Sequence, residues 1–120
     1  MKITIPVSIG ELLDKISILE IKFLLSDDEY VIKELNELNK IKSTLTQYTA
    51  EYMEQLREVN KKLWKVEDKI RKLEKEQKFD DEFIELARTV YKLNDERADI
   101  KRRINEEMLS DIREIKIFVE

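Results

Sequence analysis

The chain has 120 residues, of which 42% are charged and 42% hydrophobic, and it contains only one glycine and one proline. This composition is typical of one almost entirely helical domain, so residues 1–120 are treated as a single domain. The absence of cysteine and histidine excludes thiol catalysis, Cys/His zinc sites and histidine acid–base chemistry. A net charge of −4 and the lack of a long apolar run predict no nucleic-acid partner, no membrane partner and a cytoplasmic location.

Both ends of the chain alternate between apolar and polar residues, which is the pattern of a β-strand. Ile3, Ile5 and Val7 alternate near the N-terminus, and residues 115–119 do so at the C-terminus. One expectation is that the two termini pair as a small β-ribbon packed on the helices or on another subunit. The other is that one or both ends fray or continue a helix.

Three helices are predicted before the middle of the chain. Ser8 and Glu11 have the spacing of a capping box, so a helix should begin there and run to about Leu25. Its apolar residues cover so much of its girth that we expect it to be largely buried. An amphipathic helix is predicted from Tyr30 to about Gln47. A third helix begins near Ala50 and continues into residues 60–105 as the first helix of a hairpin.

The longest pattern, residues 60–105, predicts two long helices separated by a break at residues 78–80. Because the break is short, the two helices should pack antiparallel as a hairpin. Ser110 and Asp111 are expected to mark the end of the last helix. The predicted fold class is therefore all-α: an antiparallel helical bundle of about four helices with a long C-terminal helical hairpin.

Polar and charged residues interrupt the apolar seam of this hairpin, where a simple bundle would carry Leu or Ile. Folding the hairpin about residues 78–79 brings Asn60 level with Asn94 and Arg97, so the polar residues of the two helices should meet. Lys15 either reaches this cluster from the first helix or pairs with Glu11 on the surface. The candidate ligand-binding residues are Lys15, Asn60, Trp64, Glu67, Asp68, Arg71, Arg88, Tyr91, Asn94, Arg97 and Lys101.

This polar cluster has three interpretations. It can be a structural network that fixes helix register, as buried polar residues do in coiled coils. It can be a pocket between helices, in which arginine side chains bind an anion. The third interpretation places the charges on a solvated face.

The carboxylates were considered as a magnesium site, because some helical hydrolases hold Mg²⁺ with carboxylates three or four residues apart. Glu67 and Asp68 lack a third carboxylate, because position 71 is an arginine. Asp95 and Asp99 have the right spacing but are expected to point outward. We therefore predict no metal and no cofactor; catalytic residues are unknown, and whether the chain is an enzyme stays open.

Four blocks of the sequence resemble an uncharacterised family of short bacterial and phage proteins, described as a domain of unknown function. The first is residues 5–12, followed by residues 14–16 and 18–22. The second block is Asn60 to Trp64 with Glu67, Asp68 and Arg71. The third is residues 83–88 with Val90 and Tyr91. The fourth is Asn94 and Asp95 with Arg97, Ala98, residues 101–102 and residues 104–105. The resemblance implies a common fold over nearly the whole chain and brings no established activity.

Two hypotheses for function follow. In the first, the chain is a small helical module that binds a protein partner or associates with itself as a homodimer, which would explain hairpin ends that overhang the shorter helices. In the second, it is a small enzyme or ligand-binding protein for an anionic metabolite that is phosphorylated or linked to a sugar. The exposure of the arginines separates the two hypotheses. A closed network has each arginine paired and shielded from water, whereas a pocket leaves hydrogen-bond donors facing a cavity.

Overall fold

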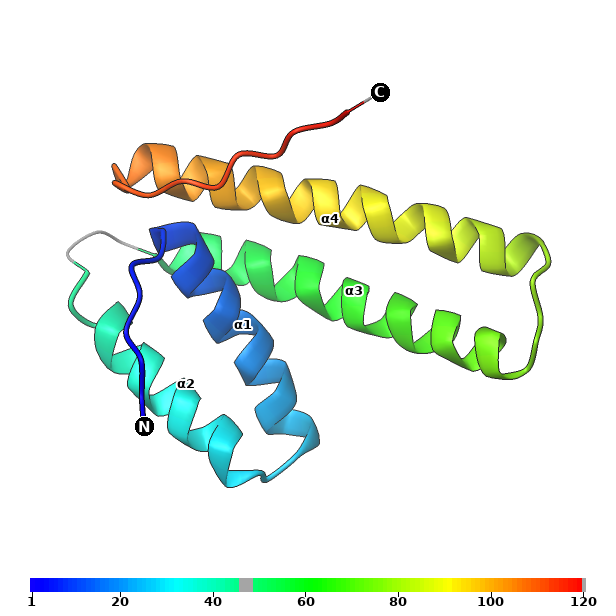
Figure 1. Ribbon diagram of the computed structural model, residues 1–120, viewed down its shortest axis with the longest axis horizontal. Coiled ribbons are helices and arrows are strands. Elements are labelled where there is room, and N and C mark those ends of the chain that lie inside the picture. Colours follow the sequence, from blue (N-terminus) through cyan, green and yellow to red (C-terminus); the bar gives the residue numbers. More distant parts are fainter. Residues whose placement is uncertain (46–48, 120) are drawn as a thin grey trace.

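The computed structural model describes residues 1–45 and 49–119, and every regular element within these ranges is an α-helix. The helices are α1 (Ile9–Leu25), α2 (Glu29–Lys42), α3 (Ala50–Lys75) and α4 (Asp81–Glu107), shown in Figure 1. The prediction of an all-α fold with about four helices and a long C-terminal hairpin is confirmed.

Helix α2 ends earlier than predicted, at Lys42 rather than near Gln47. The hydroxyl groups of Ser43 and Thr44 donate to backbone carbonyls three residues earlier, at 2.6 and 2.7 Å. These local bonds compete with continuation of the helix. Residues 46–48, which include the predicted end at Gln47, lie outside the described ranges.

Helices α3 and α4 run antiparallel and are joined by residues 76–80 (Figure 1). Gln77 has a left-handed backbone, with φ of 57°, and the Lys78 N–H donates to the carbonyl of Leu73 at 2.9 Å. This is the hydrogen-bond pattern of a Schellman helix end, which reverses the chain direction within a few residues. The predicted break at residues 78–80 lies inside this turn.

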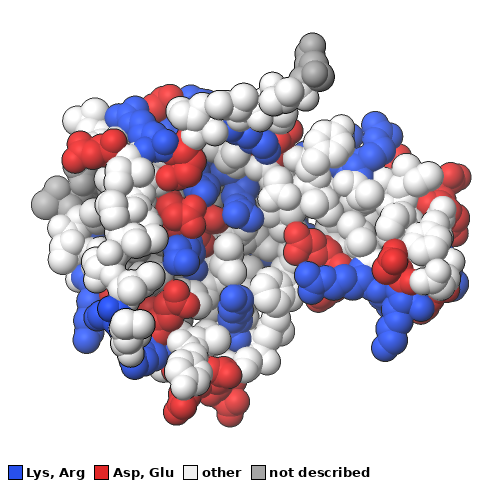
Figure 2. Space-filling view, in the orientation of Figure 1, with Lys and Arg blue, Asp and Glu red and all other residues white. Residues whose placement is uncertain are grey.

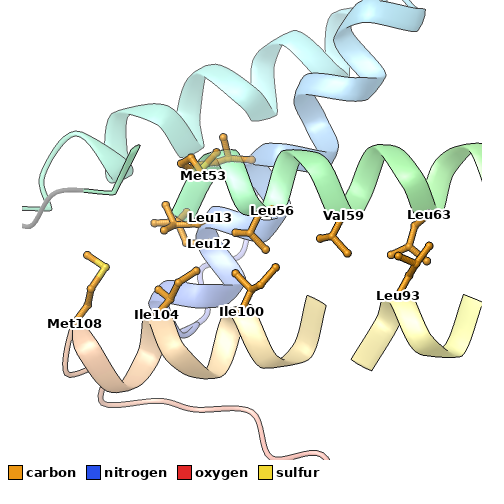
Figure 3. Packing of buried hydrophobic residues seen from close by; sticks show 11 residues of the cluster. Leu12, Leu13, Met53, Leu56, Val59, Leu63, Leu93, Ile100, Ile104 and Met108 are labelled. Atoms are coloured by element: carbon orange, nitrogen blue, oxygen red, sulfur yellow. The ribbon is translucent and has the colours of Figure 1, made fainter. Parts of the chain in front are cut away.

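Helix α1 crosses the end of the hairpin that is remote from the turn, here called the hairpin base, and α2 packs on α1 (Figure 1). The core lies at this crossing (Figure 3). Leu13, Leu56 and Ile104 come from three different helices and are fully buried. The other buried apolar residues of the core are Leu12, Ile16, Met53, Val59, Leu63, Leu93, Ile100 and Met108.

The rest of the hairpin, residues 64–95, is here called the distal arm, and it extends well beyond α1 (Figure 1). The lengths of the helices explain the overhang, because α1 has 17 residues whereas α3 and α4 have 26 and 27. At the usual rise of about 1.5 Å per residue, α3 and α4 are about half as long again as α1. Much of the arm is therefore a two-helix layer.

The predicted β-ribbon of the two termini does not form, since neither residues 1–7 nor residues 111–119 contain a strand. Each end is tied to a different helix: Lys2 pairs with Glu37 on α2, whereas Lys116 pairs with Asp95 on α4. The two segments therefore run in different directions, as Figure 1 shows: the one before α1 lies beside α2, and the one after α4 returns along α4. Their alternating apolar residues are left exposed.

Gly10 marks the closest approach of α1 to α4. A Cβ atom at this position would lie 2.8 Å from the Lys101 carbonyl oxygen and 2.9 Å from Oδ1 of Asn105. Real Cβ atoms do not come so close to backbone atoms, so only glycine allows the two helices to cross at this distance.

We predict that Gly10→Ala destabilises the fold, although alanine favours a helix over glycine by about 1 kcal/mol. Overpacking at such a contact costs about 1–3 kcal/mol, and the neighbouring backbone has little room to move. Urea unfolding measures the effect, with Asn39→Ala on the exposed face of α2 as a propensity control that should be neutral or slightly stabilising. A Gly10→Ala variant more stable than the wild type would contradict this account of the crossing.

Candidate functional site

The largest buried polar cluster surrounds Asp14 of α1, whose side chain is 1% exposed. The Asn60 side chain of α3 donates to Oδ1 of Asp14 at 2.9 Å and also to Oγ of Ser17 at 2.7 Å. Nε of Arg97 on α4 lies 3.2 Å from Oδ2 of Asp14, and Nζ of Lys101 lies 3.9 Å from the same oxygen. One carboxylate thus holds side chains from the two hairpin helices against α1. We call these five residues the Asp14 cluster.

Glu11 extends the cluster toward the surface. Its Oε2 accepts from Nζ of Lys101 at 2.6 Å, and the Lys101 side chain is largely buried. Because Glu11 and Asp14 are three residues apart on α1, and Arg97 and Lys101 four apart on α4, each pair occupies one helix face. Two carboxylates of α1 therefore face two cations of α4.

The second polar cluster fastens the end of the chain to the start of α1. The Gly10 N–H donates to Oδ1 of Asn105 at 2.7 Å, and the Ile9 N–H donates to Oγ of Ser110 at 3.1 Å. The Ser8 hydroxyl donates to Oε1 of Glu114 at 2.7 Å. We call these residues the terminal cluster. It satisfies N–H groups in the first turn of α1 that have no partner within the helix.

Both clusters are closed in their hydrogen bonding. Every buried side-chain nitrogen or oxygen in the described part of the chain has a hydrogen-bond partner. An isolated buried charge would cost several kcal/mol, so the Asp14 carboxylate requires these partners. With both oxygens engaged and almost no exposed surface, the carboxylate is not accessible to act on a substrate.

A groove lies between α4 and the C-terminal segment, with a cavity volume of about 770 Å³. Three basic residues on its walls pair with carboxylates: Lys101 with Glu11, Arg102 with Asp99, and Lys116 with Asp95. A fourth, Arg113, donates instead to the backbone carbonyl of Ser110 at 2.9 Å. The lining residues are Asp95, Ala98, Asp99, Lys101, Arg102, Asn105, Glu106, Arg113, Glu114, Ile115, Lys116 and Phe118. In Figure 2 basic and acidic side chains lie close together across this side of the molecule.

Hydrogen bonds between opposite charges shift the pKa values of Asp99 and Arg57, among others. The bond from Arg102, at 2.6 Å, lowers the pKa of the Asp99 carboxyl at the groove. The stabilisation that the Asp99–Arg102 pair contributes is therefore present above the pKa of an unfolded aspartate. It is lost as the pH falls through the lowered pKa of Asp99. The bond to Glu20 likewise raises the pKa of Arg57, where both oxygens of the carboxylate accept from Nε at 3.1 Å. This pair links α1 to α3 on the side of the crossing away from α4.

Three of the candidate residues from the sequence, Asn60, Arg97 and Lys101, come together around Asp14. Trp64 and Asn94 lie half-buried on the hairpin near them. These five residues are near the point where α1 crosses, so a third helix is available to cover part of their surface.

The other six candidates lie on exposed surface. For the five on the distal arm, this agrees with the third interpretation, which places the charges on a solvated face. Arg88 pairs with Glu85 of its own helix rather than with α3. The arm has no third layer to bury them, so these charges stay in water. The six exposed candidates are Lys15, Glu67, Asp68, Arg71, Arg88 and Tyr91.

Sequence reasoning missed Asp14, Ser17 and Asn105 as members of the buried clusters. The available signal was the wide apolar girth of the first predicted helix, because Asp14 lies within it between buried leucine and isoleucine positions. A polar residue at such a position must find a partner from another helix. Neither alternative for Lys15 is seen among the described residues, because Lys15 is exposed and Glu11 pairs with Lys101.

The described residues contain neither a metal-site arrangement of side chains nor a membrane-spanning helix. No group of three or more histidine, cysteine, aspartate or glutamate side chains is arranged to hold a metal ion there. The same part of the chain has no helix whose length and hydropathy would let it cross a membrane.

We predict that Arg97→Ala lowers the free energy of unfolding by about 2–4 kcal/mol, because it leaves the buried Asp14 carboxylate with a distant cation and one amide. Arg88→Ala on the same helix is the matched control, since Arg88 is exposed, and it should change stability by no more than about 0.5 kcal/mol. Urea unfolding of both variants makes the comparison. Equal effects would show that the Asp14 cluster contributes no more than a surface ion pair.

Comparisons with known proteins bear on the family alone. No curated protein and no solved structure matches the chain. The model of one family matches residues 1–119, nearly the full length. The chain therefore belongs to this family, DUF6165, a family of unknown function.

Proposed function

We propose that this chain is a non-catalytic helical module that associates with a second copy of itself. In this proposal the Asp14 cluster has a structural role: it fixes α1 across the hairpin base and so sets the direction of the distal arm. The outer surface of α4 and the neighbouring C-terminal segment then form the surface for the second copy. The lack of cysteine agrees with a cytoplasmic site of action.

The observation that carries the proposal is an exposed apolar stripe on the distal arm. Ile84, Ala87 and Tyr91 follow one another at intervals of three and four residues along α4, so they share one face of the helix. Ile84 is 52% exposed and Tyr91 is 55% exposed. A single exposed apolar residue is ordinary, whereas a stripe of them on one helix marks a contact surface.

The closed state of the Asp14 cluster favours this function over the binding of an anionic metabolite. An anion site needs cations whose charge is not already balanced. Lys101 is held by Glu11 and Asp14, and Arg97 is held by Asp14. Of the basic residues that line the groove, Lys101, Arg102 and Lys116 have carboxylate partners from the same chain, whereas Arg113 donates to the backbone carbonyl of Ser110.

We predict that the wild-type protein is a dimer of 14.5 kDa chains and that the double variant Ile84→Glu/Tyr91→Glu is a monomer. Two buried carboxylates in the interface would cost far more than the apolar contact contributes. Light scattering coupled to size-exclusion chromatography gives the mass over a concentration series. The control is Lys69→Ala/Lys72→Ala, which changes the net charge equally on α3 of the same arm and should remain dimeric.

A wild type that stays monomeric at every concentration contradicts the proposal. The alternative then gains if an anionic metabolite raises the melting temperature of the wild type but not of Arg97→Ala. A ligand at about 100 times its dissociation constant adds about 2.7 kcal/mol, which a thermal-shift measurement detects.

A further inference from the structure

We infer that the C-terminal segment, residues 111–119, is an interface strand that pairs antiparallel with the same segment of a second copy, across a two-fold axis at Ile117. This inference rests on the proposed self-association and names the segment that completes its interface.

The first argument is the exposure of a strongly strand-forming stretch. Residues 115–119 read Ile-Lys-Ile-Phe-Val, and β-branched and aromatic residues favour strands. Ile117 is 77% exposed and Val119 is 93% exposed. Past the Ser110 N–H, the described residues of this segment make no backbone–backbone hydrogen bond. An apolar strand with a free backbone edge is a template for pairing with another strand.

The second argument is that the segment is held in place. Glu114 accepts from the buried Ser8 hydroxyl, and Lys116 pairs with Asp95 on α4. The Ser110 side chain bonds at once to the Ile9 N–H and to the Ile112 carbonyl oxygen. These contacts fix the start and the middle of the segment along α4, so less conformational entropy is lost when a second strand binds. In Figure 2 the end of the segment nearest the C-terminus is mostly uncharged, whereas its start carries charged side chains.

The third argument is self-complementarity. A two-fold axis at Ile117 places Ile117 opposite its own copy and Ile115 opposite Val119 of the second copy, so β-branched residues meet on one face. On the other face Lys116 lies opposite Phe118 of the second copy. Within one chain, Nζ of Lys116 already lies 5.5 Å from the Phe118 ring centroid, so the pair is chemically suited. An axis one residue earlier would place two lysines opposite each other.

The fourth argument connects the strand to the stripe on α4. Ala98 lines the groove beneath the segment and lies one heptad from Tyr91, so the groove and the stripe are on the same face of α4. The segment runs along α4 toward the hairpin turn (Figure 1). In an antiparallel pair about Ile117, residues 111–114 of the second copy lie beyond Val119 of the first, toward the part of α4 that carries Tyr91, Ala87 and Ile84. One interface then covers both exposed surfaces.

The N-terminal segment is a weaker occupant of this edge. Pro6 has no N–H group to donate to a second strand. The segment also runs beside α2, where Lys2 pairs with Glu37, away from the groove.

The first experiment compares Ile117→Pro with Ile3→Pro in the full chain. Ile3 is 78% exposed, so the two sites match in residue type and exposure. We expect Ile117→Pro to raise the dimer dissociation constant by about tenfold or more and Ile3→Pro to leave it unchanged, with helical content by circular dichroism equal to that of the wild type. Dissociation by Ile3→Pro alone would overturn the inference in favour of the N-terminal segment.

The second experiment tests the register by cross-linking, since the chain has no cysteine of its own. Ile117→Cys should form a disulfide-linked dimer under mild oxidation, because the two introduced thiols face each other across the axis. Ile115→Cys should not, because its opposite residue is Val119, whereas the double variant Ile115→Cys/Val119→Cys should. Equal cross-linking of Ile117→Cys and Ile115→Cys would overturn the register.

The inference and the proposed function fail in different ways. If Ile84→Glu/Tyr91→Glu gives monomers but Ile117→Pro stays fully dimeric, the strand pairing is wrong and self-association stands. If the wild type is monomeric, the proposed function itself fails.

Discussion

The arrangement of the helices depends on one buried carboxylate. Asp14 lies inside the crossing of three helices, where an unpaired charge would be too costly to bury. Its partners, Asn60 and Arg97, come from the two helices of the hairpin, α3 and α4. The carboxylate of α1 therefore meets both partners only where α1 crosses the hairpin base. Buried polar contacts can fix one register among several that apolar packing alone would allow. The carboxylate selects one, and the close contact at Gly10 allows only a narrow approach.

This constraint decides which surfaces remain free. With α1 fixed at the base, most of the distal arm extends beyond the region α1 covers, and the face of α4 bearing Ile84 and Tyr91 stays exposed. The terminal cluster then directs the C-terminal segment back along the same helix. In the proposed function, this network determines which surface is left for a second copy. Polar residues inside a helical module are explained by specificity as much as by stability.

Local signals in the sequence predict the helices well, because caps and periodicity act within one turn. The hydroxyl of Ser8 does cap α1, accepting from the Glu11 N–H at 3.0 Å. The seam of the hairpin likewise identified Asn60 and Arg97 as neighbours. Asp14 was missed because its partners depend on the crossing of α1, which no spacing within a helix encodes. For the same reason the sequence left open whether Arg88 and Glu67 are buried or solvated, since burial on the arm would need a third helix.

The most direct test of this account is a double-mutant cycle between Asp14→Asn and Arg97→Gln, measured by urea unfolding. If the Asp14 carboxylate and the Arg97 guanidinium depend on each other inside the crossing, the effects of the two single substitutions on the free energy of unfolding will not add. The coupling free energy will then be about 1–3 kcal/mol. Circular dichroism of each variant would confirm that the helices remain. A coupling near zero would mean that Asp14 does not hold the hairpin against α1, and the position of α1 would need another cause.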